Sequence, residues 1–523
     1  MLPQYRLNHY IWHKLSAKPQ YVKGMKMLIT QANLILCGLD STPQSILIRD
    51  NKIVRVGARV DGVETADDVL DAGGRLVVPG FFDSHAHILG REFDVITVDF
   101  DRTQSVEELL AQVVEKEEEV GPREWIVGIN WDDSKIRGIE KLSRRLLDKT
   151  GLDNPIFLQR VCGHAAFLNR RALGILAEER RSSEMAHLID FDNGRIEEDA
   201  VHLVRELVQL GRGDRLIGIE RSIASALSLG ITSVCEMHCL PQQFELMREA
   251  ATNIRLFAYL DYIDDSSFGE LARLEPTRLC RAAGLKLVAD GSIGARTAAV
   301  SRPFHGTDSH GRLLLEKDDL VPVVREALRR GVQLAVHAIG DRAIESVIAA
   351  YEEAGAERFP DHRHRLEHLE VLPRPFDETL DRLKRTGLIA SMQPDFITSW
   401  GHEDAMYGER FGPDWNSTNA FGLVFQRGIP LAFGSDSMPI GPIYGLRGAV
   451  EHPNEDSRLD LADAIAAYTA GGAYAVFGEG NQGRITPGMA ADLTLLSCKT
   501  PDCILDAEVD ATIMDGQVVF QRS

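Results

Sequence analysis

Short apolar runs alternate with amphipathic segments through the middle of the chain. Ten of the apolar runs have the length and composition of buried strands, from "RLVVPGFFDS" (75–84) through "GLKLVAD" (284–290) to "IPLAFGSD" (429–436). Residues 105–119, 318–331 and 341–355 carry apolar positions at helical spacing, and the last two segments end in glycine. Near-continuous apolar strands joined by helices are typical of a parallel sheet covered by helices. We therefore expect an α/β fold with a (β/α)₈ barrel, and a doubly wound sheet is the second interpretation.

Both ends of the chain have a different pattern, in which short β-like runs are separated by Asn, Asp and Gly. Asp515-Gly516, between "ATIM" and "QVVF", is a hairpin turn signal. The pattern predicts one small β-sandwich domain built from residues 27–78 and 483–523, with the barrel occupying residues 79–482.

Two of the ten candidate strands, "EWIVGIN" and "PIFLQRV", lie in an interval that is too long for one β–α connection. We assign them to an insertion at residues 95–220, between the first and second barrel strands. Residues 1–26 contain five Lys or Arg and no acidic residue, and they have no continuous apolar core. They are interpreted as an N-terminal tail, or as residues ahead of a true start at Met25 or Met27, and not as a secretory signal.

The composition and the net charge of the chain argue against several classes of partner. The formal net charge of −20 argues against nucleic acid or an anionic membrane as a partner, since both require a basic surface. No apolar run approaches the length of a membrane span. Seven scattered cysteines, an odd number, suggest reduced thiols. We expect a cytoplasmic protein with a small-molecule substrate, either a monomer or a homodimer.

Polar side chains occur where several of these apolar strands end, which is where barrel enzymes place their chemistry. Each alone has an ordinary explanation: a histidine can be satisfied within a core, a lysine can extend to the surface, and an aspartate can cap a helix. Together they form a set of metal-ligating types suited to Zn, Mn or Fe. The set consists of His85, His87, Lys286, His337, His368 and Asp436.

Lys286 is the unusual member, because an apolar strand does not tolerate a buried lysine without a strong partner. A lysine next to metal ions can react with CO₂ to give a carbamate (N6-carboxylysine), which is an anionic bridging ligand. The hypothesis is then a site with two divalent metals, in which Asp436 takes a proton from the attacking water and passes it to the leaving group.

Several segments are similar to one known family. "VVPGFFDSHAH", "LKLVADGSIGARTAA", "VHAIGDRAI", "RLEH", "FGSDSMP" and "GRITPGMAADLTLL" resemble the amidohydrolase superfamily, in the branch of the N-substituted formamide deformylase type. The resemblance extends from about residue 27 to the C-terminal region. It implies a distorted (β/α)₈ barrel with a composite β-sandwich and a divalent metal cofactor, most simply two Zn²⁺ per chain, with Mn or Fe as alternatives.

The resemblance also implies roles for individual residues. His85 and His87 would bind the first metal with Asp436, His337 and His368 the second, and carboxylated Lys286 would bridge them. The candidate substrate-binding residues are His164, Trp131, Arg296 and Gln393, with Trp400 as a further candidate. For each of these residues, the alternative interpretation is that it packs in a core or lies on the surface.

Two positions depart from the family pattern. Cys162 stands where an acidic residue is usual, and His238 stands where a small residue is usual. Cys235, His238 and Cys239 could form an additional metal site, but packing and pocket shape are the preferred interpretation. Both departures bear on substrate specificity.

The function predicted from these residues is hydrolysis of a C–N bond in an amide, formamide or cyclic amide by metal-bound hydroxide. A mononuclear deaminase and an ester or lactone hydrolase of the same superfamily are the alternatives among enzymes. A non-catalytic assembly or binding protein on the same scaffold is the alternative from another class. It is disfavoured because all six ligand positions are filled.

Overall fold

The computed structural model describes residues 25–522 except 35–43, 59–65, 90–92, 94–95, 134, 162–164, 209 and 360. The proposed tail, Cys162 and His164 therefore lie outside the described residues, apart from Met25 and Lys26. The chain divides into two compact units, one formed by residues up to 88 together with 223–523, and the other by 89–222. The insertion was expected at 95–220.

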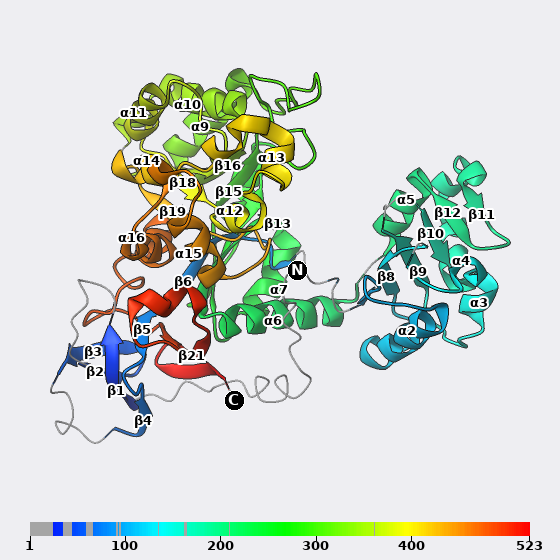
Figure 1. Cartoon of the computed structure of the whole chain (residues 1–523), viewed down its shortest axis with the longest axis horizontal. Helices are drawn as coiled ribbons and strands as arrows, with labels where there is room; N and C mark the ends of the chain where they lie inside the picture. Colours follow the sequence, from blue (N-terminus) through cyan, green and yellow to red (C-terminus); the bar gives the residue numbers. More distant parts are fainter. Residues whose placement is uncertain are drawn as a thin grey trace. The chain divides into compact units, whose positions relative to one another are not determined.

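The first unit contains a parallel eight-stranded barrel (Figure 1). Its strands follow one another around the barrel in chain order. They are β6 (Phe81–Ala86), β13 (Ile231–Cys239), β14 (Arg255–Asp261), β15 (Cys280–Val288), β16 (Gln333–Ala338), β17 (Arg365–His368), β18 (Ile389–Met392) and β19 (Leu431–Phe433). The barrel is nearly closed, because the Asp436 amide just after β19 donates to the carbonyl of His85 on β6 at 2.7 Å.

Helices follow most barrel strands and cover their outer side (Figure 1). They are α6 (Arg212–Ser228), α7 (Pro241–Ala250), α8 (Ser266–Leu271), α9 (Lys317–Arg330), α10 (Asp341–Ala354), α11 (Phe376–Thr386), α12 (Asp395–Trp400), α13 (Met406–Phe411), α14 (Phe421–Gln426), α15 (Pro442–Val450), α16 (Leu461–Ala466) and α17 (Gly472–Ala475). The helices predicted at 318–331 and 341–355 are α9 and α10, and each ends at a left-handed glycine, with φ of 65° at Gly331 and 74° at Gly355.

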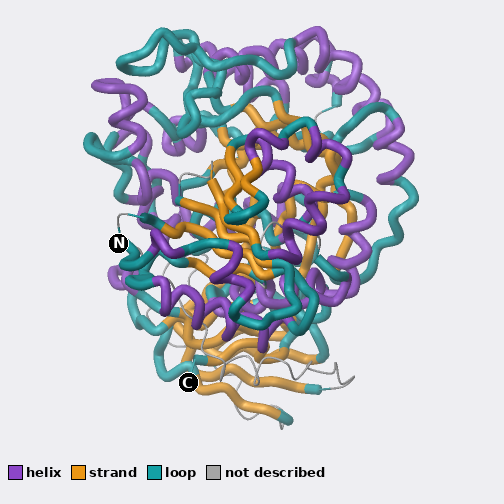
Figure 2. The backbone as a smooth tube through the Cα atoms, turned by 90° about the vertical axis from the view of Figure 1, so that its right-hand side faces the viewer, coloured by secondary structure: helices purple, strands orange, loops and turns teal. Residues whose placement is uncertain are grey.

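The two chain ends come together in one composite β domain, as expected, and its strands form a single sheet where a β-sandwich is predicted. Its strands are β1 (Lys26–Leu34), β2 (Gln44–Arg49), β3 (Lys52–Gly57), β4 (Asp68–Asp71), β5 (Leu76–Pro79), β20 (Leu493–Leu496), β21 (Val509–Met514) and β22 (Gln517–Gln521). Strands from both ends share one apolar core that includes Ile29, Ile48, Leu493 and Ile513. These strands form layers at the lower end of Figure 2, beside the C-terminus. The predicted turn joins β21 to β22, with positive φ at both Asp515 and Gly516.

The apolar run 75–84 is divided between the sheet domain and the barrel. Strand β5 pairs with β1 and β20, whereas β6 pairs with β13. The division falls at Gly80, where an added Cβ would lie 2.3 Å from Thr232 Oγ1. A second link is Arg255, whose guanidinium is buried against Asp492 and Asp515 at 2.8 and 2.6 Å. The barrel and the sheet domain are therefore joined both by chain and by a buried ion-pair network.

The second unit has its own sheet and its own core. The elements are β7 (Thr97–Asp99), α2 (Val106–Val120), β8 (Ile126–Trp131), α3 (Arg144–Asp148), β9 (Ile156–Arg160), β10 (Ala165–Leu168), α4 (Arg170–Glu178), β11 (Ile189–Asp190), β12 (Arg195–Glu197) and α5 (Asp199–Leu207). The two runs assigned to an insertion are β8 and β9. Ser105 caps α2 as predicted, but the Glu108 carboxylate accepts from the amide of Gln104 and not from that of Ser105.

The predicted fold class, a (β/α)₈ barrel with a composite β domain and an insertion after the first barrel strand, is confirmed. Within the part of the chain that is described, no helix is both long and apolar enough to cross a membrane. The five cysteines in that part are all free thiols.

Candidate metal centre

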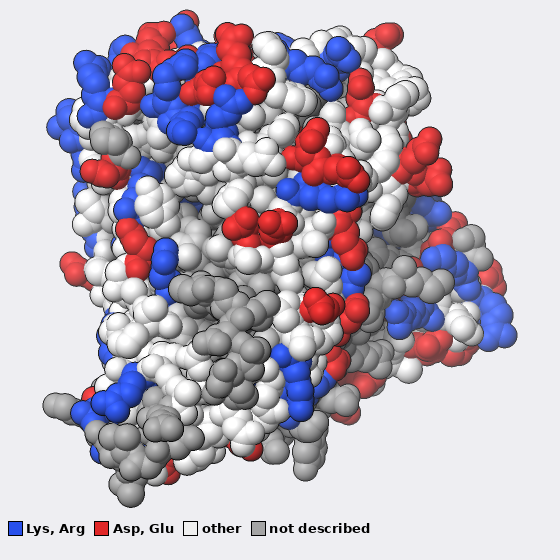
Figure 3. Space-filling model, turned by 60° about the vertical axis from the view of Figure 1, so that its left-hand side comes forward, with Lys and Arg blue, Asp and Glu red and all other residues white. Residues whose placement is uncertain are grey.

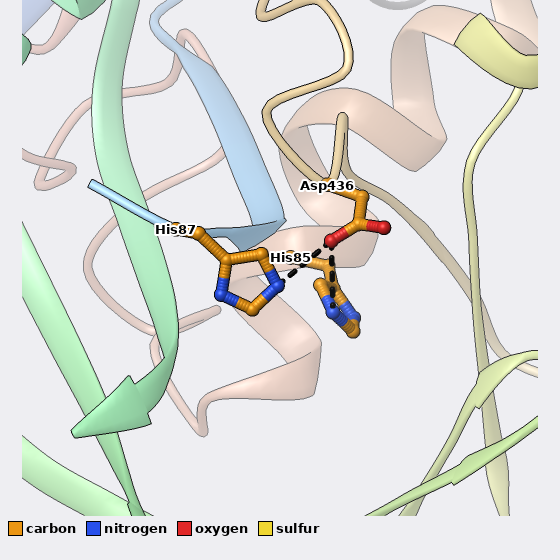
Figure 4. A group of neighbouring side chains, drawn as sticks. All are labelled: His85, His87 and Asp436. Atoms are coloured by element: carbon orange, nitrogen blue, oxygen red, sulfur yellow. Dashed lines mark ion pairs between the residues drawn. The ribbon is translucent and has the colours of Figure 1, made fainter. Parts of the chain in front are cut away.

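His85, His87 and Asp436 converge at one end of the barrel (Figure 4). His85 is on β6 and His87 directly follows it, while Asp436 follows β19 on the neighbouring side of the barrel. Asp436 Oδ1 lies 2.8 Å from His87 Nε2 and 3.6 Å from His85 Nε2. One ligand atom from each of the three residues lies within 4.8 Å of the others. Two imidazoles and a carboxylate at such separations suit a divalent metal ion, and so the donor set fits the cofactor.

The loop that carries Asp436 is tightly held. Buried Asp83 accepts hydrogen bonds from the amide and the hydroxyl of Ser435, at 2.9 and 2.6 Å. The His87 amide donates to Ser437 Oγ at 2.9 Å. Asp436 and Ser437 both have left-handed backbones, with φ of 53° and 59°. Non-glycine residues adopt this region at a cost that the surrounding structure must offset, a situation common at functional sites.

His337 and His368 form a second pair beside the first group. Their ring centroids are 4.4 Å apart, and the His368 ring lies 4.6 Å from that of His85. His337 Nε2 donates to the Gly291 carbonyl at 3.0 Å, and His368 Nδ1 donates to Gln393 Oε1 at 2.8 Å. Each hydrogen bond fixes which ring nitrogen carries the proton. The lone pairs of His337 Nδ1 and His368 Nε2 are therefore left for a ligand.

The protonation of these histidines follows from their surroundings. Burial, together with the nearby cation Lys286, holds the pKa of His85 well below its usual value, and burial with His337 does the same for His368. For His87, burial opposes the charge, but hydrogen bonds to Asp436 and Glu236 prevail and raise the pKa to about 9. Two imidazoles are thus ready to coordinate, while a metal must displace a proton from the third.

Lys286 lies inside β15 and is 3% exposed. Burial lowers its pKa to about 8, although the carboxylates of Glu367 and Asp436 oppose the shift. Among the described residues, none is within hydrogen-bond or ion-pair distance of its amine. In the parallel register Lys286 is level with Ala335 and Val288 with His337. The amine is therefore placed in the same barrel interior as the histidines.

The remaining predicted residues have different surroundings. Gln393 is buried and orients His368. Arg296 is half-buried in the loop after β15, has a left-handed φ of 55°, and its Nε is buried without a hydrogen bond. Trp131 lies in the core of the second unit, where its Nε1 donates to the Leu158 carbonyl. Substrate contact by these residues stays a prediction, as does that by His164.

The additional metal site weighed at positions 235–239 is not assembled. Cys235 contacts the buried guanidinium of Arg365, and the Cys239 thiol donates to the Leu240 carbonyl. His238 points elsewhere, with its Nδ1 at 2.8 Å from Asp261 Oδ1 and its ring stacked on His87. Among the described residues, His85, His87 and Asp436 are the only group of three with metal-ligating geometry.

Sequence reasoning missed the carboxylates that orient the ligands. Glu367 Oε2 accepts from His85 Nδ1 at 2.7 Å, and Glu236 Oε1 lies 3.7 Å from His87 Nδ1. Asp290 accepts hydrogen bonds from three backbone N–H groups in the loops after β15 and β16. One of them is the N–H of Ile339, which directly follows β16, the strand that carries His337. A signal existed in the sequence, since Glu236 interrupts the apolar run "VCEM" and Glu367 directly precedes a candidate ligand in "RLEH".

Comparison with known proteins agrees with this geometry. A family model described as the amidohydrolase family matches residues 68–520. The chain belongs to the amidohydrolase family. Among solved structures, an uncharacterized metal-dependent hydrolase from Pyrococcus furiosus superposes with a TM-score of 0.75 at 28% identity, covering 91% of this chain and 99% of that one.

Two relatives align with this amidohydrolase over almost their full lengths. N-substituted formamide deformylase of Arthrobacter pascens is 25% identical, with 95% of this chain and 98% of the relative aligned. The protein LONG AFTER FAR-RED 3 of Arabidopsis thaliana is 26% identical, covering 98% and 95%. The family and the structural neighbour confirm the prediction of an enzyme, a metal-dependent hydrolase that takes a divalent metal.

Proposed function

We propose that this amidohydrolase hydrolyses a C–N bond in an amide, formamide or cyclic amide at a site for two divalent metal ions. The observation that carries the proposal is the cluster of His85, His87 and Asp436 next to a second histidine pair and a buried lysine. His85, His87 and Asp436 would hold one ion, and His337 and His368 the other, with carboxylated Lys286 between them. Zn²⁺ is the expected ion, because imidazole and carboxylate ligands suit it.

The bound metal would supply Lewis acidity, which lowers the pKa of water and polarises a carbonyl. The protein residues then handle the proton. Oδ1 of Asp436 faces the two histidine nitrogens, which leaves Oδ2 to accept a proton from the attacking water. The water oxygen bonds to the carbonyl carbon, the C–N bond breaks, and Asp436 delivers the same proton to the departing nitrogen. No net proton is consumed at Asp436, so it is ready for another turnover.

We favour hydrolysis of a C–N bond over hydrolysis of an ester bond for a chemical reason. An amine is a poor leaving group until its nitrogen is protonated, and Asp436 is placed to do this. The similarity to a formamide deformylase over 95% of this chain supports the same class. Ester or lactone hydrolysis uses the same groups and is the first alternative. A mononuclear deaminase is less favoured, because it leaves the buried Lys286 without a role.

Metal content tests the proposal first. Protein purified without chelators is expected to contain about two zinc, manganese or iron ions per chain by elemental mass spectrometry. Chelation should abolish hydrolysis of a panel of N-substituted formamides and cyclic amides, and Zn²⁺ with bicarbonate should restore it. One ion per chain after such reconstitution would contradict the binuclear site. Full ester but no amide hydrolysis would contradict the bond assignment.

Arg296 is the residue we propose for substrate specificity. Its half-buried side chain has an Nε without a hydrogen bond, and its backbone is held in a left-handed conformation in the loop after the lysine strand. A guanidinium can bind a carboxylate through two parallel hydrogen bonds. Arg296→Ala is therefore expected to raise KM about 10- to 100-fold for a substrate that carries a carboxylate. KM for its uncharged analogue should stay unchanged, and an equal rise for both substrates would contradict the role.

His164, Gln393 and Trp131 remain proposed substrate contacts, and Gln393 would act in part through His368. We further propose a cytoplasmic monomer or homodimer that acts on a small molecule, with no nucleic-acid or membrane partner. The net charge of −20 supports this. On the face drawn in Figure 3, the described acidic and basic side chains are interspersed and do not gather into a basic area.

A further inference from the structure

Arg365 lies inside the barrel, in contact with several of its strands. Arg365, the first residue of β17, is 0% exposed. Its guanidinium donates to the Ser84 carbonyl on β6, to Tyr259 Oη on β14 at 3.1 Å and to Ser391 Oγ on β18 at 2.9 Å. It also contacts Cys235 Sγ on β13 at 3.5 Å. One side chain thus connects β17 to four other strands of the barrel.

The same guanidinium forms an ion pair with Glu367, two residues along the strand. Arg365 Nε lies 2.7 Å from Glu367 Oε1, and a terminal guanidinium nitrogen lies 3.0 Å from Oε2. Side chains two apart in a strand face the same way, so both point into the barrel interior. Glu367 is fully buried as well. Burying an ion pair completely costs free energy of desolvation, and removing one partner leaves an unpaired buried charge.

Glu367 continues the chain of contacts to a metal ligand. Its Oε2 lies 2.7 Å from His85 Nδ1, and the paired carboxylate accepts a hydrogen bond from the N–H of that nitrogen. His85 Nε2 is then the unprotonated nitrogen, and it is the one that faces Asp436. An imidazole whose other nitrogen donates to a carboxylate is held in one tautomer and one orientation, and it is a stronger metal ligand.

We infer that Arg365 and Glu367 are positioning residues for the metal centre, which fix the tautomer and the orientation of His85 from inside the barrel. The inference rests on the proposed metal site. Arg365 fixes Glu367 relative to the surrounding strands, and Glu367 fixes the ring of His85. Because β17 also ends in His368, this one strand supplies a ligand of the second pair and the support for a ligand of the first.

Zinc binding to the metal-free protein tests the inference without any substrate. Glu367→Gln preserves the shape of the side chain but removes its charge. We expect its dissociation constant for Zn²⁺, measured by competition with a chromogenic chelator, to rise about 10- to 100-fold. Metal content should recover at saturating Zn²⁺, because the ligands themselves remain. If Glu367→Gln does not fold, the double variant Arg365→Met with Glu367→Gln removes both charges together and is expected to show the same weakened binding.

Asp492→Asn is the matched control. Asp492 is the buried carboxylate partner of Arg255, at 2.8 Å, and it contacts no metal ligand in the described structure. Its variant should lose stability in urea like Glu367→Gln but keep the wild-type affinity for Zn²⁺. Unchanged zinc affinity in folded Glu367→Gln, or equal weakening in both variants, would overturn the positioning role. Absence of zinc binding by the wild-type protein would instead overturn the proposed function and, with it, the inference.

Discussion

Asp436→Asn is expected to lower kcat about 10³-fold, since general acid–base groups contribute roughly 10²- to 10⁴-fold. The side-chain amide of the asparagine cannot accept the proton of the attacking water and cannot return one to the departing nitrogen. Its oxygen can still face the two nitrogens that Asp436 Oδ1 now faces at 2.8 and 3.6 Å. We therefore expect much of the metal to be retained. The measurement is kcat and elemental metal content on the same preparation.

Asparagine is the right replacement because of the backbone. The φ of 53° at this position is tolerated by Asn and Asp better than by other non-glycine residues, so Asp436→Ala would add strain to the loss of the carboxylate. Exposed Asp318 on α9, whose side chain is 87% exposed, gives the control Asp318→Asn, with kcat expected to be unchanged. Unchanged turnover in Asp436→Asn with full metal content would show that this carboxylate carries no proton.

The strand pattern allowed the fold to be predicted because most barrel strands are apolar runs, and several of them have a polar residue at or just after the carboxyl end. His85, His337, His368 and Asp436 could be assigned to one site on that basis. Parallel strands bring such ends together whatever the sequence distance between them. The turn at Asp515-Gly516 was predictable for a local reason, since both residues readily adopt positive φ.

The orienting groups could not be predicted in the same way. Glu367 acts on His85, which lies 282 residues earlier in the chain, and the sequence does not show which strands are close across the barrel. The role of Arg365 depends on four strands at once. The sequence indicates Gln393 as a substrate contact, and only the structure shows its hydrogen bond to His368. Trp131 packs in the core of the second unit, which is the packing interpretation that the sequence leaves open beside substrate contact.

Replacing Lys286 is expected to have an effect comparable to that of replacing Asp436. The buried amine, with its pKa lowered to about 8, is neutral in a far larger fraction of molecules near neutral pH than an ordinary lysine. Only the neutral amine reacts with CO₂, so this environment favours the carbamate. Lys286→Ala should retain about one metal ion per chain instead of two. Its kcat should fall at least ~10²-fold, which corresponds to about 3 kcal/mol of lost transition-state stabilisation.

A pair of variants separates the bridging role from packing. Lys286→Ala leaves space in the barrel, which added acetate can enter to supply a carboxylate in place of the carbamate, and so acetate should restore part of the second metal and of the activity. Lys286→Met fills that space with an uncharged side chain of similar length. In the metal-free state it should be as stable as the wild type or more so, because the cost of burying an amine is removed, yet acetate should not restore its activity. Full metal content and full activity in Lys286→Met would show that the lysine is not a ligand. Rescue of both variants by acetate would show that the added anion acts elsewhere.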